Sequence, residues 1–186
     1  LEETAAFEPL RDLVENIYTN EYLEMLLPKW NAAIQEPDAF MALPLQRDFY
    51  ARNLKNAKER TVVIISDAMR YEVGKELFRR MQDDPKCTAK LEVQLSVLPS
   101  YTRLGMAALL PHAELTMMDD FKVLIDGMPC DNLAEREAVL HKYSKDSTCV
   151  QFDNIKSLKV VELRSIFTGK QVVYVYHNQI DARGDK

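Results

Sequence analysis

The sequence predicts an α/β fold in which helices flank a mostly parallel sheet, preceded by a helical leader. Residues 61–66 and 171–176 are apolar, β-branched or aromatic runs, typical of strands in a parallel sheet that is covered on both faces. Segments with helical periodicity alternate with such strands, which favours right-handed βαβ crossovers. We therefore divide the chain into a leader, residues 1–58, and one α/β domain, residues 60–186.

The leader shows two helical patterns and no recognisable chemistry. Apolar residues recur at helical spacing from residue 9 to about residue 34, and Pro28 predicts a kink or a restart. A second helix is expected over residues 44–58, where apolar and basic residues separate onto two faces. We interpret the aromatic residues of this leader as packing residues.

Helices and strands are expected to alternate through the α/β domain. The strand over residues 61–66 is predicted to be central and buried on both faces. The elements expected after it are helix 71–82, strand 91–98, helix 102–110, helix 133–143, strand 149–152, helix 160–167 and strand 171–176. Because a doubly covered last strand needs further neighbours, we expect the chain to be a fragment of a longer protein.

The composition is that of a folded globular protein. Of 186 residues, 47% are hydrophobic and 28% charged, which argues against disorder, and the net charge of -5 argues against indiscriminate nucleic-acid binding. No apolar run is long enough to span a bilayer, so we expect no membrane association and a cytoplasmic location. The cysteines Cys87, Cys130 and Cys149 form no C-x-x-C pair, and we interpret them as thiols in a reducing compartment.

Polar residues follow three of the predicted strands, where ligands bind in open α/β sheets. They are Ser66-Asp67, the segment Pro99–Arg103, and the segment His177–Asp181. Each has a structural alternative when taken alone. Asp67 is well placed to cap the helix that starts near residue 70, and hydroxyl groups before a helix are common caps. A single histidine beside a strand end is more often part of a hydrogen-bonded structure than a ligand.

Taken together, the three segments favour metal-assisted chemistry on a phosphate ester. A carboxylate, an imidazole and a hydroxyl at one sheet edge suit a divalent metal that activates the hydroxyl. The helix start at Thr102 offers amide donors to a phosphate, and Arg103 is expected to pair with the same group. We therefore predict that Asp67 is a metal ligand and that the reaction is phosphoryl transfer or phosphate-ester hydrolysis.

The same segments resemble a known family. The sequences Ile64–Glu72, Leu98–Pro111 and Val175–Lys186 are similar to motifs of the PglZ family, which belongs to the alkaline phosphatase superfamily and takes part in bacterial BREX phage defence. The stretch Leu10–Tyr18 also resembles the segment before that family's phosphatase domain. The resemblance implies that residues 60–186 are the N-terminal half of an alkaline-phosphatase-like core.

The resemblance also implies roles for individual residues. Asp67 matches the first metal-ligand aspartate and Thr102 the nucleophile, with Ser100 as a second candidate nucleophile. Asp181 and His177 lie in the loop that carries further ligands in the superfamily. Zinc is the expected metal, with manganese or magnesium as alternatives. The later Asp-His pair and the last histidine of the superfamily have no counterpart here, so we expect the isolated fragment to bind metal incompletely and to be inactive.

Three functional hypotheses follow. The first is a phosphatase acting on a phosphate ester, with nucleotides and nucleic acids as candidate substrates and other BREX proteins as partners. The second is a non-catalytic interaction module of the defence complex. The third, a response-regulator-like domain, ranks last because Thr102 and Arg103 stand where that domain needs a plain switch residue.

Overall fold

The computed structural model describes residues 7–36 and 42–184. The chain forms two compact units, residues 1–43 and residues 44–186. Residues 44–58, which the sequence assigns to the leader, lie within the second unit.

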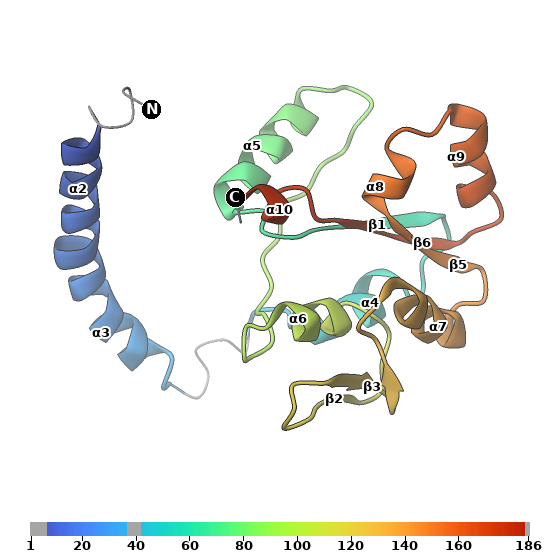
Figure 1. Ribbon diagram of the computed structural model, residues 1–186, viewed down its shortest axis with the longest axis horizontal. Helices are drawn as coiled ribbons and strands as arrows, with labels where there is room; N and C mark the ends of the chain where they lie inside the picture. Colours follow the sequence, from blue (N-terminus) through green and yellow to red (C-terminus); the bar gives the residue numbers. More distant parts are fainter. Residues whose placement is uncertain (1–6, 37–41, 185–186) are drawn as a thin grey trace. The chain divides into compact units, whose positions relative to one another are not determined.

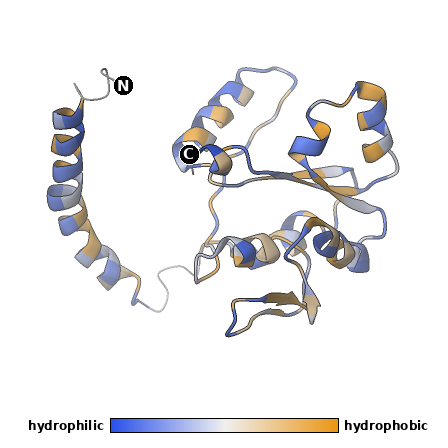
Figure 2. Cartoon of the chain, viewed as in Figure 1, coloured by the Kyte–Doolittle hydropathy of each residue, from blue (hydrophilic) through white to orange (hydrophobic). Residues whose placement is uncertain are grey.

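The described part of the first unit is a long helix with a change of winding in its middle. An α-helix, α2 (Glu8–Asn16), passes into a π-helical segment, η1 (Ile17–Leu23), and then into α3 (Glu24–Ala33). Pro28 lies inside α3, so the predicted restart at this proline is wrong and the irregular winding lies upstream of it. Figure 2 shows apolar and polar residues interspersed along this helix, and none of its residues is buried.

The second unit is built around a parallel sheet of three strands in the order β1-β6-β5. These strands are β1 (Thr61–Ser66), β6 (Val172–His177) and β5 (Ser147–Gln151). The predicted α/β class with a mostly parallel sheet and flanking helices is confirmed. β6 is central, and its first five residues are all buried because β1 and β5 pair with its two edges and helices lie over both faces of the sheet.

β1 differs from the prediction of a central strand buried on both faces. It pairs with β6 alone and forms an edge of the described sheet. Val63 faces the core at 8% exposure, whereas Ile64 on the opposite face is 67% exposed. The β-branched run therefore reports strand propensity correctly, but burial is decided by the position of the strand in the sheet.

Helices lie on both faces of this sheet (Figure 1). On one face lie α4 (Phe49–Asn53), α6 (Thr102–Ala108) and α7 (Leu133–Tyr143), and on the other lie α5 (Tyr71–Gln82), α8 (Phe152–Ile155) and α9 (Val160–Phe167). α7 begins with a capping box in which Asn132 accepts from the Glu135 amide and the Glu135 carboxylate accepts from the Asn132 amide. α10 (Asp181–Gly184) follows β6.

The predicted strand over residues 91–98 is absent from the sheet. Within that segment only Leu95 forms a β-bridge, with Leu45, and the other residues belong to no helix or strand. The predicted helix over residues 44–58 is also shorter, being a 3-10 turn, η2 (Gln46–Asp48), followed by α4. The two segments pair with each other, because the Gln46 amide donates to the Leu95 carbonyl (2.8 Å) and the Leu95 amide donates to the Pro44 carbonyl (2.8 Å).

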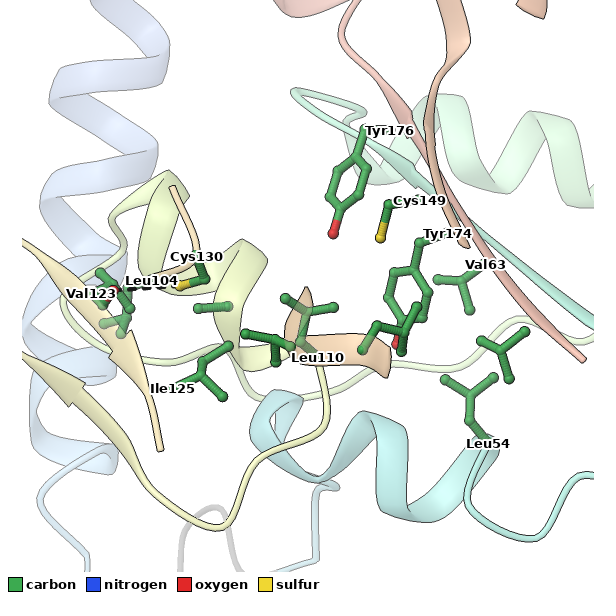
Figure 3. Packing of buried hydrophobic residues seen from close by; sticks show 14 residues of the cluster. Leu54, Val63, Leu104, Leu110, Val123, Ile125, Cys130, Cys149, Tyr174 and Tyr176 are labelled. Atoms are coloured by element: carbon green, nitrogen blue, oxygen red, sulfur yellow. Dashed lines mark hydrogen bonds between the residues drawn. The ribbon is translucent and has the colours of Figure 1, made fainter. Parts of the chain in front are cut away.

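A small antiparallel sheet, which the sequence did not indicate, packs against α6. Its strands are β2 (Leu115–Met117), β3 (Val123–Ile125) and β4 (Met128–Pro129). Its buried Val123 and Ile125 join the core cluster that also contains Leu104, Leu110 and Tyr174 (Figure 3). The core therefore continues from the parallel sheet through α6 to this second sheet.

Asp126, in the turn after β3, contacts both the segment before β2 and the end of α7. Its carboxylate accepts from the amides of Ala113 (2.9 Å) and Glu114 (2.8 Å) and from the Tyr143 hydroxyl, and Lys142 lies 3.5 Å away. Burial by itself would raise the pKa of Asp126, but these hydrogen bonds and the lysine together lower it to about 2.

This lowered pKa predicts a pH-dependent contribution to stability. Asp126 is ionised in the folded state below its unfolded pKa of about 3.9, so its contribution is present above that pH and is lost as the pH falls toward 2. We expect Asp126→Asn to lower the free energy of unfolding at pH 7, and the difference from wild type to shrink between about pH 5 and about pH 2. Urea unfolding of both proteins across this range measures it. A difference that stays constant with pH would contradict the assignment.

Within residues 7–36 and 42–184, no helix has both the length and the apolar character needed to cross a membrane.

Candidate active site

Asp67 stands at the carboxyl end of β1. Its amide donates to the His177 carbonyl (3.0 Å), which extends the pairing of β1 with β6 by one step. The chain then turns at Ala68, whose φ of 59° lies in the left-handed region. The Asp67 carboxylate accepts a hydrogen bond from the Ala68 amide (3.0 Å), and no lysine or arginine of the described residues forms an ion pair with it.

The structure does not use Asp67 as a helix cap. The N-cap of α5 is Arg70, and no side chain caps that helix end. Asp67 is therefore not a helix cap, and among the described residues its half-buried side chain accepts a hydrogen bond only from the Ala68 amide.

Thr102 is the first residue of α6. The N-cap is Tyr101, and the helix start has no side-chain cap, so the Thr102 hydroxyl does not serve as one. Thr102 is exposed, and its hydroxyl forms no hydrogen bond with another described residue. The described structure therefore gives this hydroxyl no partner, and its predicted role as nucleophile stays a prediction.

Asp67 and Thr102 line the same pocket, although 35 positions separate them in the sequence. The pocket has a volume of about 320 Å³ and lies between the end of β1, the segment before α6, and α6 itself. Its polar side chains come from Gln46, Ser66, Asp67, Ser96, Ser100, Tyr101 and Thr102. The structure thus brings together the predicted metal ligand and both candidate nucleophiles.

His177 and Asp181 are near the same sheet edge but are not among the lining residues of this pocket. His177 ends β6, and its Nδ1 lies 2.9 Å from the hydroxyl of Ser66, the residue before Asp67. Its ring packs edge-to-face on Phe152, with ring centroids 4.9 Å apart. Asp181 is half-buried and opens the short helix α10.

Arg103 does not line the pocket either. Its guanidinium lies 3.7 Å from the Asp131 carboxylate, and its side chain is 54% exposed. Asp131 is in the loop before α7, where Arg136 donates to its carbonyl (3.1 Å). The structure therefore places Arg103 in a contact between α6 and this loop, and its predicted pairing with phosphate stays a prediction.

The described residues hold no group of three or more histidine, cysteine, aspartate or glutamate side chains able to bind a metal. The two buried thiols are also unsuited to this role as they stand. Burial raises the pKa of Cys130 to about 11 and that of Cys149 to about 12, so both are protonated rather than thiolate ligands.

Two residues that line the pocket were not predicted from the sequence. Gln46 lies in the segment that we had interpreted as leader without chemistry, and Ser96 in a segment that we had predicted to be a strand. No local motif marks either residue. Only the pairing of their two segments, at Leu45 and Leu95, brings them to the pocket.

Comparison with known proteins identifies the family. Residues 48–186 match the family described as the BREX system PglZ alkaline phosphatase-like domain. The chain belongs to the PglZ family. This assignment confirms the resemblance of the three motifs and replaces the response-regulator-like interpretation.

Two curated relatives are similar over nearly the whole chain. The alkaline phosphatase-like protein PglZ of Bacillus cereus (strain H3081.97) is 40% identical over 192 residues, covering 100% of this chain. The alkaline phosphatase-like protein BrxZ of Escherichia coli O9:H4 (strain HS) is 36% identical over 188 residues, covering 95% of it. The chain spans 22% of the length of each relative. No solved structure matches the chain.

Proposed function

We propose that this chain supplies part of the active site of a metal-dependent phosphatase or phosphodiesterase that acts in BREX phage defence. Thr102 is the nucleophile and Asp67 a metal ligand. The observation that carries the proposal is the shared pocket, which is lined by both Asp67 and Thr102, two residues whose side chains cap no helix. The alkaline phosphatase-like family of the chain supports the reaction class.

The charge of the pocket supports a metal requirement. Asp67 is the only charged residue that lines it, and no lysine, arginine or histidine does so among the described residues. A phosphate ester is an anion, so a bare carboxylate would repel it. A divalent cation held by Asp67 would reverse the local charge, which makes this pocket suitable for a phosphate ester.

The donors of the pocket match a divalent metal in kind but not in number. Asp67 and the hydroxyls of Thr102 and Ser66 are hard oxygen donors, which suit magnesium, manganese or zinc. A zinc ion usually binds four ligands, more than the pocket supplies by itself. We propose that His177, Asp181 and residues of the longer protein complete the set, since the curated relatives extend far beyond the matched segment.

The residues of this chain support transfer of the phosphoryl group to the hydroxyl of Thr102. When bound, a metal would lower the pKa of the nucleophilic hydroxyl. Thr102 Oγ forms a bond to phosphorus while the bond from phosphorus to the ester oxygen breaks, and the hydroxyl proton passes to solvent. The departing alkoxide takes up a proton. Water then attacks the phosphoryl group on Thr102, which restores the hydroxyl and releases phosphate from a monoester or a phosphate monoester from a diester.

A non-catalytic interaction module is the second candidate. It is favoured by the described residues holding no three-residue metal cluster, and by the helix of the first unit, most of whose large apolar side chains are exposed. In that case the chain binds other BREX proteins and the pocket has no chemical role.

Hydrolysis by the full-length protein distinguishes the two candidates. We expect hydrolysis of at least one ester in a panel of phosphomonoesters and phosphodiesters, including nucleotides and DNA, in the presence of zinc, manganese or magnesium. Metal analysis of the purified protein should find a bound divalent ion. A protein that binds no metal and hydrolyses no ester in the panel would favour the interaction module.

A further inference from the structure

Gln46 joins the two segments that form the wall of the pocket. Its side-chain Oε1 accepts from the Val97 amide (3.1 Å), and its Nε2 donates to the Gly105 carbonyl (3.2 Å) in α6. One amide group therefore links the extended segment before Thr102 to the helix that begins at Thr102. Gln46 is half-buried and also lines the pocket.

The backbone on either side of Gln46 strengthens this link. The Gln46 amide donates to the Leu95 carbonyl, and the Pro44 carbonyl accepts from the Leu95 amide, both at 2.8 Å. The segment 44–46 thus forms a strap along the segment 95–97, held by two backbone bonds and by the Gln46 side chain. The chain has only four residues between Val97 and Thr102, so restraint at Val97 limits where Thr102 lies.

We propose that Gln46 is a positioning residue that fixes Thr102 in the pocket, by holding the segment before α6 and α6 itself in one arrangement. The proposal rests on the nucleophilic role proposed for Thr102. Gln46 lies outside the stretch that matches the family, which begins at residue 48. The segment upstream of the phosphatase-like domain therefore contributes to the geometry of the site.

A matched control exists in the same unit. Gln171 is also half-buried, and its Nε2 donates to two backbone carbonyls, those of Ala57 (3.2 Å) and Glu59 (2.8 Å). It precedes β6, at the opposite end of that strand from His177. Gln171→Ala thus removes two comparable hydrogen bonds away from the pocket, whereas Gln46→Ala removes two beside it.

Steady-state kinetics and amide exchange of the full-length variants test the proposal. We expect Gln46→Ala to lower kcat by about tenfold or more with a change in KM below about twofold, because a displaced nucleophile weakens the chemical step more than binding. Amide hydrogen exchange should become faster in peptides covering residues 97–105. Gln171→Ala should lower the melting temperature by a similar amount. It should leave kcat and the exchange of residues 97–105 unchanged.

Each outcome separates this proposal from the proposed function. Equal losses of kcat in the two variants, or unchanged exchange over residues 97–105 in Gln46→Ala, would overturn the positioning role. Absence of hydrolysis by the wild type counts against the proposed function. In that case amide exchange alone tests whether Gln46 holds the segment before α6 in place. Faster exchange over residues 97–105 in Gln46→Ala would support this, and unchanged exchange would refute it.

Discussion

Thr102→Ala is expected to abolish most of the hydrolysis by the full-length protein, with a loss in kcat on the order of 10³-fold or more. The variant removes the hydroxyl that would form the bond to phosphorus. Thr102 is exposed and its side chain neither caps α6 nor forms a hydrogen bond with a described residue. The melting temperature should therefore stay within a few degrees of the wild-type value, on the order of what surface substitutions produce.

Two controls make this result specific. Ser100→Ala removes another hydroxyl from the same pocket and should leave kcat within about tenfold of wild type. Thr102→Ser keeps a hydroxyl at the position and should retain activity. If Ser100→Ala were the inactive variant and Thr102→Ala the active one, the nucleophile would be Ser100. Phage defence that survives in Thr102→Ala would favour the interaction module.

Asp67→Asn is expected to weaken the binding of a divalent metal by at least about 100-fold. Removing a residue that merely hydrogen-bonds to a metal ligand costs up to about 100-fold in affinity, and removing a ligand should cost at least as much. The amide keeps the size of the side chain but removes the negative charge that no described basic residue balances. Without metal, the free energy of unfolding should change by less than about 1 kcal/mol, because the carboxylate forms only one hydrogen bond within the described part of the chain.

Thermal unfolding with and without metal measures this effect. The wild-type melting temperature should rise when zinc or manganese is added, since a ligand that binds only the folded state stabilises it, and the rise should vanish in Asp67→Asn. Asp120→Asn, which removes a carboxylate paired with Lys122 between β2 and β3, should keep the full rise. An equal rise in Asp67→Asn would show that the metal binds elsewhere.

Two of the helices and the last strand were predictable because their signals are local. The helix over residues 133–143 and the helix over residues 160–167 have the predicted bounds, since capping residues and apolar spacing define a helix within its own sequence. The strand predicted over residues 171–176 is found as β6, because its continuous apolar pattern is that of a covered strand. Its central place in the sheet was not predicted, since the sequence assigned that place to residues 61–66.

The wrong strand predictions have a common physical cause. The sequence of a segment does not show which other segment it pairs with. Residues 91–98 have strand-like alternation, but only Leu95 finds a backbone partner, at Leu45. β1 has a central-strand sequence but lies at an edge of the described sheet. The small sheet of β2, β3 and β4 was missed because its strands are two or three residues long, too short for a periodic signal.

The site shows the same division. Asp67 was predicted from its place after a strand that the structure contains, whereas the strand expected before Thr102 is absent. The structure nevertheless places both residues at one pocket. The role of Gln46 depends on contacts with Val97 and Gly105, which lie 51 and 59 positions away in the sequence. No spacing rule reaches that far, so only the folded chain reveals it.

The most direct test of the shared site is ester hydrolysis by the full-length protein after its metal has been removed by a chelator and then returned. For an ester that the wild type hydrolyses, we predict no turnover in the stripped protein and recovery on return of zinc or manganese. Thr102→Ala and Asp67→Asn should show no recovery under the same conditions. Hydrolysis that continues unchanged in the stripped protein, or that recovers fully in both variants, would contradict a metal-dependent site built on Asp67 and Thr102.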